Sequence, residues 1–283
     1  MIANKMNDTN RKSGVSRKAI ASALIMALAL SGCGIFGGKD KPKTPTIGNR
    51  EPILSRIESG ANVDPSLAGV AVVVPTPQVN AEFAQPGGTA SKSYGHLAIG
   101  DAPVELWRAQ IAGSSKTRRL ASAPVVGGGM LFAVGTDGVV SALDAATGAA
   151  VWTHRMPDVG DLAASVFGGG ASYSNGRLYV TSGVGDVVAL DAKTGSQFWT
   201  AKPGGPLRGP PTIAFNAVFV MSQSNQIYAL NAADGTPQWN DGGSAGQTGV
   251  FGVAAPAAGQ GSIIAGYSSG ELAAYRYENG REL

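Results

Sequence analysis

Cysteine and histidine are almost absent from this chain, and their scarcity excludes several kinds of site. The 283 residues include one cysteine, Cys33, and two histidines, His96 and His154. A zinc centre needs three or four Cys, His or acidic ligands gathered at one point, and so few of them do not predict one. A single cysteine also excludes a disulfide within the chain. The composition favours a protein without a metal centre, and no cofactor is expected.

Charged residues are also few, at 14% of the chain, and they are unevenly placed. The 22 Lys and Arg exceed the 19 Asp and Glu, but five of these basic residues and only one acidic residue precede Cys33. The rest of the chain has a net charge of −1, which does not predict the basic groove that nucleic acid requires. Low charge together with 41 glycines argues against disorder and is typical of an all-β repeat protein.

The second half of the chain contains a repeat. An Asp or Asn is followed four residues later by Gly, and four residues after that by Trp, at intervals of 40–47 residues. The three full copies are Asp144, Gly148 and Trp152; Asp191, Gly195 and Trp199; and Asn231, Gly235 and Trp239. A fourth copy begins with Arg276 and Gly280. A recurrence of this length indicates a repeat architecture.

Each copy contains short runs of Val, Leu and aromatic residues bounded by Gly, Asn and Asp, which predicts strands joined by hairpin turns. The expected strands are 124–126, 130–134, 139–143 and 149–154; 171–174, 177–181, 187–190 and 197–201; 211–214, 218–221, 226–230 and 237–240; and 256–258, 262–266 and 271–275. Asn175-Gly176 is an expected hairpin turn. Four strands in each repeat predict an all-β fold of four-stranded antiparallel blades, a β-propeller. The closely spaced Gly-rich turns argue against a solenoid of helices.

The repeated residues have structural explanations. The glycine suits a backbone position with positive φ, and the Asp or Asn side chain can accept a backbone N–H and fix the turn. The Trp ring can pack between neighbouring blades while its N–H donates to a carbonyl. A quinone or metal site built from these residues is the other interpretation, and their presence in every blade favours the structural one.

The first 33 residues have the pattern of a bacterial lipoprotein signal. Basic residues at 11–18 precede an apolar run at 19–30, which is too short to span a bilayer. The run ends in Leu-Ser-Gly-Cys at 30–33, which resembles the lipobox, where the signal is cut before a cysteine that is then acylated. We therefore expect residues 1–32 to be a signal peptide and Cys33 to carry lipid, including palmitate, that anchors the protein.

Two segments are expected after the signal peptide is removed. Residues 33–78 predict a lipid-anchored flexible tether, with one possible strand at 68–74. Residues 79–283 predict a partial propeller. Residues 105–108 read as the last strand of an earlier, incomplete blade, because Trp107 lies one repeat length before Trp152.

The lipobox, the segment around residues 63–65 and 95–101, and the Trp-bearing repeats together resemble the BamB family, lipoproteins of the outer-membrane β-barrel assembly machinery. Family members have eight blades, so the resemblance implies that these four blades are a C-terminally truncated fragment. It implies a non-enzymatic scaffold that binds the barrel-forming partner and other machinery components. It also implies help in inserting unfolded outer-membrane proteins, and an anchored position on the periplasmic side of the outer membrane.

The resemblance also implies a contact loop, which maps to two places. In the family, a loop carrying Leu-Arg-Gly contacts the barrel-forming partner, and by motif this is Leu207, Arg208 and Gly209. By blade register it is instead the loop containing Val250 and Phe251, where the Arg is absent. An exposed Arg beside an apolar residue is a plausible interface anchor, which favours the first mapping.

Two other functions fit the repeats. Quinoprotein dehydrogenases, which use pyrroloquinoline quinone and Ca²⁺, share this repeat pattern. They are much longer, and they stack the quinone on a vicinal disulfide or similar platform, with carboxylates on the calcium. A single cysteine excludes the disulfide, and the sequence contains no evident acidic cluster. A propeller sensor domain cut from a larger receptor is the third interpretation, and the lipobox argues against it.

Overall fold

The computed structural model describes residues 64–67, 69–114, 122–157, 168–244 and 255–283. The chain divides into two units, Met1–Ala71 and Val72–Leu283. In the described part of the first unit, the regular structure is a short 3-10 helix, η2, at Pro65–Leu67. Across the described ranges, no helix has the length and apolar character needed to cross a membrane. All the strands belong to the second unit.

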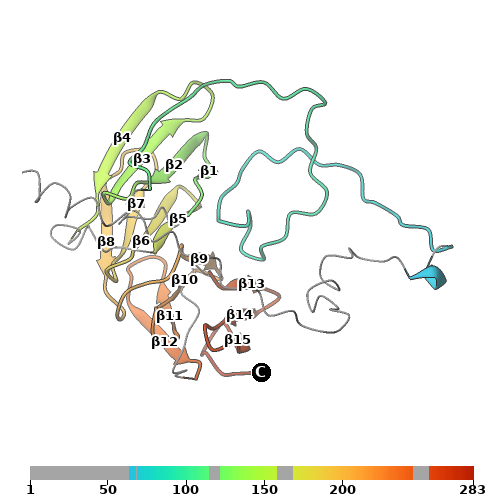
Figure 1. Cartoon of the computed structure of the whole chain (residues 1–283). Helices are drawn as coiled ribbons and strands as arrows, with labels where there is room; N and C mark the ends of the chain where they lie inside the picture. The colour runs from blue at the N-terminus through green and yellow to red at the C-terminus, as the bar shows by residue number, and fades with distance from the viewer. Residues whose placement is uncertain (1–63, 68, 115–121, 158–167, 245–254) are drawn as a thin grey trace, which may run out of the picture. The chain divides into compact units, whose positions relative to one another are not determined.

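The strands form four antiparallel sheets that follow one another along the chain (Figure 1). Three sheets have four strands in sequential order, and the described part of the fourth has three. Their bounds are β1 Val125–Gly127, β2 Met130–Val134, β3 Val139–Asp144 and β4 Ala150–Arg155; β5 Gly169–Ser174, β6 Arg177–Ser182, β7 Val187–Asp191 and β8 Gln197–Ala201; β9 Thr212–Ala214, β10 Ala217–Met221, β11 Gln226–Asn231 and β12 Pro237–Gly242; and β13 Ala257–Gly259, β14 Ser262–Gly266 and β15 Leu272–Arg276. The predicted all-β fold of propeller blades is confirmed, and each expected repeat strand is present within two residues at its ends.

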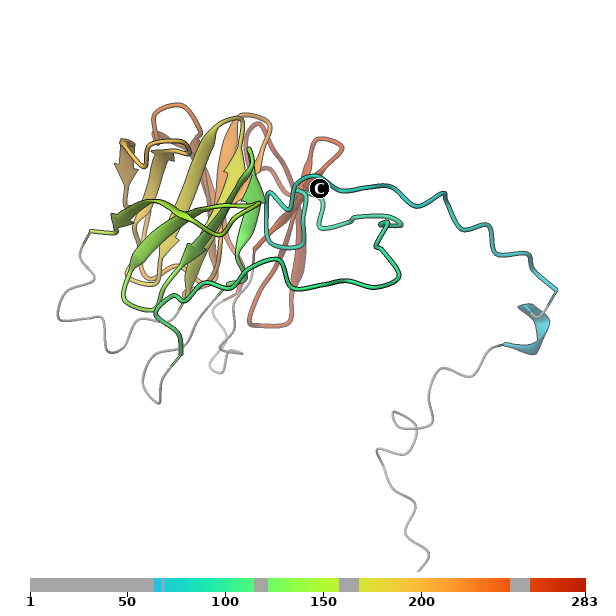
Figure 2. The same cartoon turned by 90° about the horizontal axis from the view of Figure 1, so that it is seen from above.

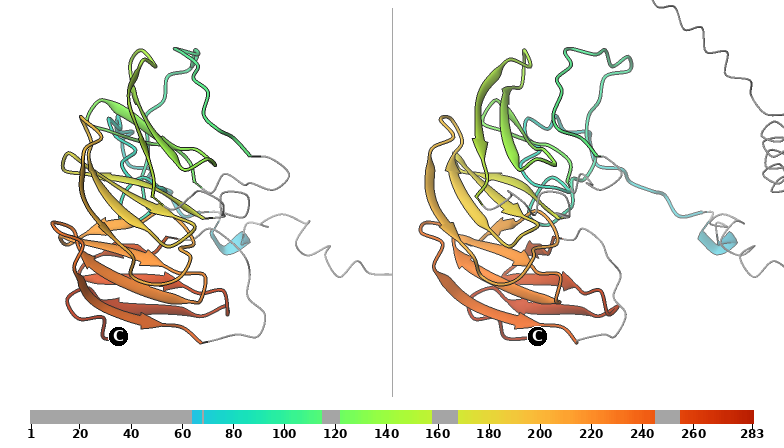
Figure 3. Two further views of the ribbon diagram at one scale, coloured as in Figure 1. Left: turned by 90° about the vertical axis from the view of Figure 1, so that its left-hand side faces the viewer. Right: turned by 60° about the vertical axis from the view of Figure 1, so that its left-hand side comes forward.

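Successive sheets pack face to face (Figures 2 and 3). Alternate side chains of each strand enter one of three apolar clusters, each shared by two neighbouring sheets. Phe132, Leu190 and Phe219 are examples of fully buried residues in or between these clusters. The first strands β1, β5, β9 and β13 lie on one side of the sheets, and β4, β8 and β12 lie on the other (Figure 1). We call the first set the inner strands.

The repeated tryptophans join each blade to the next. Trp152 on β4 donates its indole N–H to the Ala192 carbonyl of the second blade, at 2.9 Å. Trp199 and Trp239 make the equivalent bonds one and two blades further on. The ring in each case lies against the repeat glycine of the next blade: a Cβ built on Gly195 would be 2.7 Å from Trp152 ring carbons. The glycine is therefore required for space as well as for its φ of +73°.

The repeat Asp fixes the turn that receives this ring. Asp144 Oδ1 accepts the backbone N–H groups of Ala146 and Thr147. Asp191 makes the corresponding bonds in the second blade, and Asn231 accepts one of them in the third. The Thr147 hydroxyl, which also donates to Asp144 Oδ1, lowers the pKa of the Asp144 carboxyl, and the Thr194 backbone N–H lowers that of Asp191. The structural interpretation of the repeat residues thus has direct geometric support.

Two expected strands are absent. Residues 105–108 form no strand, yet Trp107 occupies the same position as the other tryptophans, because it donates to the Ala145 carbonyl and covers Gly148. In the described part of 68–74 there is also no strand, and Val72, Val73 and Val74 are exposed. A β-branched run predicts a strand only when a partner is available to pair with it.

A segment before the propeller crosses all four inner strands. We call residues 83–90 the inner strap. Phe83 pairs with Val126 of β1 through two backbone bonds of 2.8 Å, and the Ala84 carbonyl accepts the N–H of a β5 residue. The Gln85 side chain bonds both the N–H and the carbonyl of Ile213 on β9. The Ala90 carbonyl accepts the N–H of Ala258 on β13. The strap therefore ties every blade on its inner side.

Candidate partner-binding loop

The linker between the second and third blades, residues 202–211, is the inter-blade linker that the structure describes in full. It leaves β8 and crosses the end of β10 before entering β9. Arg208 N donates to the Met221 carbonyl at 2.8 Å, and Gln223 N donates to the Pro206 carbonyl at 2.7 Å. Further along, Thr181 Oγ1 donates to the Gly209 carbonyl at 2.8 Å. Bonds from both neighbouring blades give the linker a defined conformation.

The expectation that Arg208 is exposed beside Leu207 is wrong. Leu207 is 0% exposed and belongs to the apolar cluster between the second and third blades, while Arg208 is 5% exposed. Burial lowers the pKa of the Arg208 guanidinium. Leu207 is drawn inward because its backbone pairs with Ser222 as an extra bridge beside β10. Leu207 packs into the apolar cluster beneath the linker, and both side chains are too buried to form a large contact with a partner protein.

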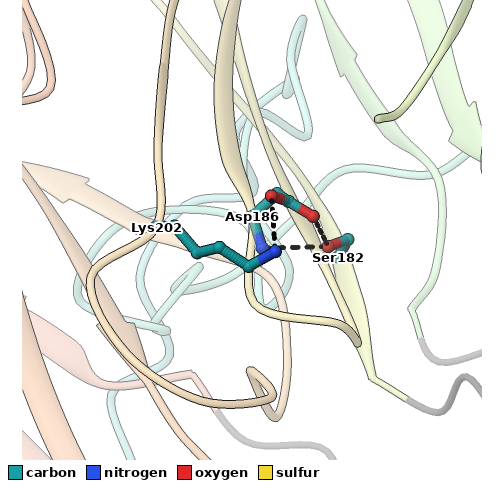
Figure 4. Close-up of polar contacts among 3 residues, drawn as sticks. All are labelled: Ser182, Asp186 and Lys202. Atoms are coloured by element: carbon teal, nitrogen blue, oxygen red, sulfur yellow. Dashed lines mark hydrogen bonds and ion pairs between the residues drawn. The ribbon is translucent and has the colours of Figure 1, made fainter. Parts of the chain in front are cut away.

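The exposed part of the linker precedes this pair and contains Lys202, Gly205 and Pro206. Lys202 Nζ lies 3.6 Å from Asp186 Oδ1, and the Asp186 carboxylate also accepts the Ser182 hydroxyl at 3.0 Å (Figure 4). Asp186 immediately precedes strand β7 of the second blade and is buried. A buried carboxylate needs such partners, so this contact holds the start of the linker against the second blade.

The remaining residues expected for partner binding and lipid attachment lie outside the described part of the chain. Val250 and Phe251 lie in 245–254, and Cys33 lies in 1–63, both outside the described residues. The alternative mapping of the contact loop and the lipid attachment therefore stay predictions.

The described residues offer little for catalysis. Within the described ranges, no group of three or more His, Cys, Asp or Glu side chains is placed to hold a metal ion. A Gly-x-Ser-x-Gly pattern occurs at 266–270, but it forms the β14–β15 hairpin rather than the strand-to-helix turn of a hydrolase. Its Ser268 hydroxyl donates to Asn225 Oδ1 at 2.7 Å. His96 Nδ1 is within 2.6 Å of the Pro75 carbonyl, far along the chain from this serine.

Sequence reasoning missed the inner strap and the Asp186 contact. The strap has no periodic pattern, because its bonds are mostly made by its backbone. The sequence around Asp186 gave a weak indication of the contact, because this acidic residue directly precedes the apolar strand predicted at 187–190. A lone acidic residue at such a position indicates a partner, but its spacing gives no indication that the partner is Lys202.

Comparison with known proteins places the repeats in a described family. The family model of the outer membrane protein assembly factor BamB matches residues 104–166 and 136–283, which together cover more than half of the chain. Comparison with curated proteins gives no match.

Two solved dehydrogenase structures share the fold, and a BamB structure is also similar to this chain. BamB from Moraxella catarrhalis is 21% identical with a TM-score of 0.49, over 62% of this chain and 47% of that one. A europium-containing methanol dehydrogenase is 16% identical with a TM-score of 0.58, over 71% and 48%. The quinohemoprotein alcohol dehydrogenase from Comamonas testosteroni is 20% identical with a TM-score of 0.56, over 71% and 40%. The chain thus spans about half the length, or less, of these structures, and at these identities the likeness concerns the fold alone.

Proposed function

Because this chain belongs to the family of the outer membrane protein assembly factor BamB, we propose that it is a non-enzymatic scaffold of the β-barrel assembly machinery. It binds the barrel-forming partner and other components of the machinery, and it assists the insertion of unfolded outer-membrane proteins. The observation that carries this proposal is the family match, whose two overlapping segments, 104–166 and 136–283, include all four sheets.

The geometry of the inner side supports a scaffold role. A quinone cofactor or another ligand at the centre of a propeller would need access to the inner strands. In this chain the inner strap already bonds to β1, β5, β9 and β13. The strap thus occupies backbone N–H and carbonyl groups of the inner strands that a central ligand would use. This favours partner binding through the loops and edges of the propeller.

We place the partner contact on the exposed part of the 202–211 linker. Its backbone is held by bonds to β10, and its start is held by the Lys202–Asp186 contact. A pre-ordered loop binds with a smaller loss of conformational entropy than a free one. Leu207 and Arg208 then act as supports that position Gly205 and Pro206, and the partner touches the exposed residues.

A charged substitution at the exposed Pro206 tests this contact. Pro206→Lys places a long cation at the exposed surface and removes no backbone N–H bond, since proline has none. We expect partner binding to fall at least about tenfold, equivalent to about 1.4 kcal/mol, with thermal stability nearly unchanged. The measurement is a pull-down of the barrel-forming component, followed by titration with the purified component.

Pro237→Lys is the matched control, because Pro237 is also exposed but lies at the start of β12, at the opposite end of the blade. Leu207→Ala should instead lower stability by about 2–5 kcal/mol, as deletion of a buried leucine does. Full partner binding by Pro206→Lys, or equal loss in Pro237→Lys, would dismiss this linker as the contact.

We also propose that acylated Cys33 anchors the scaffold to the outer membrane, on its periplasmic side. Each buried CH₂ of an acyl chain contributes about 0.8 kcal/mol to membrane binding, so several chains hold the protein firmly. Cys33→Ser should abolish incorporation of radiolabelled palmitate and shift the protein from the membrane fraction to the soluble one. Cys33→Ser protein that remained labelled would place the lipid elsewhere.

A quinoprotein dehydrogenase is the alternative function, and the likeness to the two dehydrogenases with TM-scores of 0.58 and 0.56 is the observation that favours it. At identities of 16% and 20% that likeness carries only the fold. Titration with pyrroloquinoline quinone and Ca²⁺ separates the two functions.

A further inference from the structure

A pocket of about 480 Å³ opens between the second and third blades, at the end of the strands opposite to the 202–211 linker. It is formed by the β5–β6, β9–β10 and β11–β12 turns. Neutral polar and apolar residues line it in similar numbers, with two aromatic rings and one charge: Asn175, Arg177, Tyr179, Phe215, Asn216 and Gln238 are among them. Arg177 is the one charged residue in this lining, so the pocket is electrostatically complementary to an anion.

Arg177 is held in place by its surroundings. Its Nη1 donates to the Ala232 and Ala233 carbonyls, each at 3.0 Å. Its Cζ lies 4.6 Å from the centre of the Phe198 ring, in a cation–π arrangement. A guanidinium has five N–H donors in a planar fork, and Nη1 supplies only two of them. The Tyr179 hydroxyl also accepts a bond from this guanidinium. The donors that remain on the fixed guanidinium suit a carboxylate, which accepts two parallel bonds.

Phe215, one of the aromatic residues that line the pocket, has a backbone conformation that is unfavourable for a bulky side chain. Phe215 and Asn216 form the β9–β10 turn with φ values of +51° and +57°. The equivalent turns of the other blades use Gly128-Gly129, Asn175-Gly176 and Gln260-Gly261, each with Gly at the second position. A bulky residue at positive φ is unusual, and such strain is concentrated at functional sites. Phe215 remains 39% exposed, although its ring centre lies 4.3 Å from that of Tyr277.

We propose that this pocket binds a peptide carboxylate that lies next to an apolar side chain. Arg177 contacts the carboxylate, Phe215 contacts the apolar side chain, and the amides of Asn175, Asn216 and Gln238 are available to the peptide backbone. Asp234, in the turn before β12, is not in the lining of the pocket, and its Oδ1 accepts the hydroxyl and backbone N–H of Thr236. An exposed aromatic beside a fixed Arg is also the composition of interface hot spots.

Titration of the full chain in detergent micelles with three small peptides, followed by nuclear magnetic resonance, tests the proposal. The probes are acetyl-Ala-Phe with a free C-terminal carboxylate, acetyl-Glu-Phe-amide and acetyl-Ala-Phe-amide. We expect binding in the millimolar range by at least one of the two carboxylate peptides, and at least tenfold weaker binding by the uncharged amide. The stronger of the two carboxylate peptides identifies the source as a chain terminus or an acidic side chain. Equal binding of all three peptides, or binding of none, would overturn the proposal.

Two variants connect the binding to the pocket. Arg177→Gln should weaken the carboxylate peptide at least tenfold, whereas Arg155→Gln should not, since Arg155 is an exposed residue on β4 that donates to the Asp137 carbonyl. Phe215→Gly should also weaken binding while the turn persists, because glycine accepts positive φ without strain. Unchanged affinity in Arg177→Gln or in a folded Phe215→Gly protein would refute the assignment. This site does not depend on the proposed scaffold function, so its failure would leave the 202–211 contact intact.

Discussion

Trp199→Ala should lower the free energy of unfolding by about 3–5 kcal/mol, as removal of other large buried aromatic side chains does. Trp199 is 8% exposed and belongs to the apolar cluster between the second and third blades. Its indole N–H donates to the Ala232 carbonyl at 3.2 Å, and its ring packs against Gly235. The substitution therefore removes apolar contact, a hydrogen bond and the junction between two blades at the same position.

Chemical denaturation of the full chain, monitored by circular dichroism, measures this loss. Phe198→Ala is the matched control, because Phe198 is the adjacent aromatic residue but is 50% exposed, and its loss should cost less than about 1 kcal/mol. Gly235→Ala should also destabilise the protein, since the new Cβ would be 2.6 Å from the Trp199 ring and φ is +77°. Equal effects of Trp199→Ala and Phe198→Ala would show that the repeat tryptophan does not join the blades.

The second large effect is expected in the inner strap. Gln85→Ala should lower the free energy of unfolding by about 2–5 kcal/mol, because it leaves the N–H and the carbonyl of Ile213 without their partner in a buried place, at about 1–3 kcal/mol for each group. The Gln85 amide bonds these groups at 2.9 and 3.0 Å, and Gln85 is buried. The two lost hydrogen bonds are those that join the strap to β9, one of the four inner strands that it contacts.

Hydrogen exchange of the backbone amides locates this effect as well as measuring it. In Gln85→Ala, protection should fall at Ile213 and at the other strap contacts, Val126 and Ala258, whose N–H groups donate to strap carbonyls. Gln78→Ala is the control, because Gln78 is exposed and pairs through its backbone. Unchanged exchange at the inner strands would mean that the strap does not tie the blades.

The blades could be predicted from the sequence because their pattern is local and repeated. Strands β2, β8 and β14 have the predicted bounds, since Gly-rich turns and alternating apolar residues determine each hairpin independently of the rest of the fold. The Trp–Gly junction was also predictable, because Trp and Gly recur together at a fixed spacing in neighbouring repeats. A single copy of this pattern would be a weak indication of the fold, but its recurrence in four copies makes the prediction reliable.

The candidate site could not be predicted in the same way. Leu207 and Arg208 match a contact motif, but exposure depends on how the linker crosses β10, which is a long-range property of the fold. The inner strap joins Gln85 to Ile213, which is 128 residues away, and no spacing encodes such a contact. The positive φ of Phe215 is equally hidden, because its sequence lacks the Gly that marks the equivalent turns.

The proposed scaffold function requires that this propeller binds proteins and carries no quinone at its centre. Parallel equilibrium titrations of the full chain test it most directly, one with pyrroloquinoline quinone and Ca²⁺ and one with the purified barrel-forming component of the assembly machinery. We expect saturable binding of the protein component and no absorbance change with quinone. Tight quinone binding with an absorbance change, together with no binding of the protein component, would contradict it.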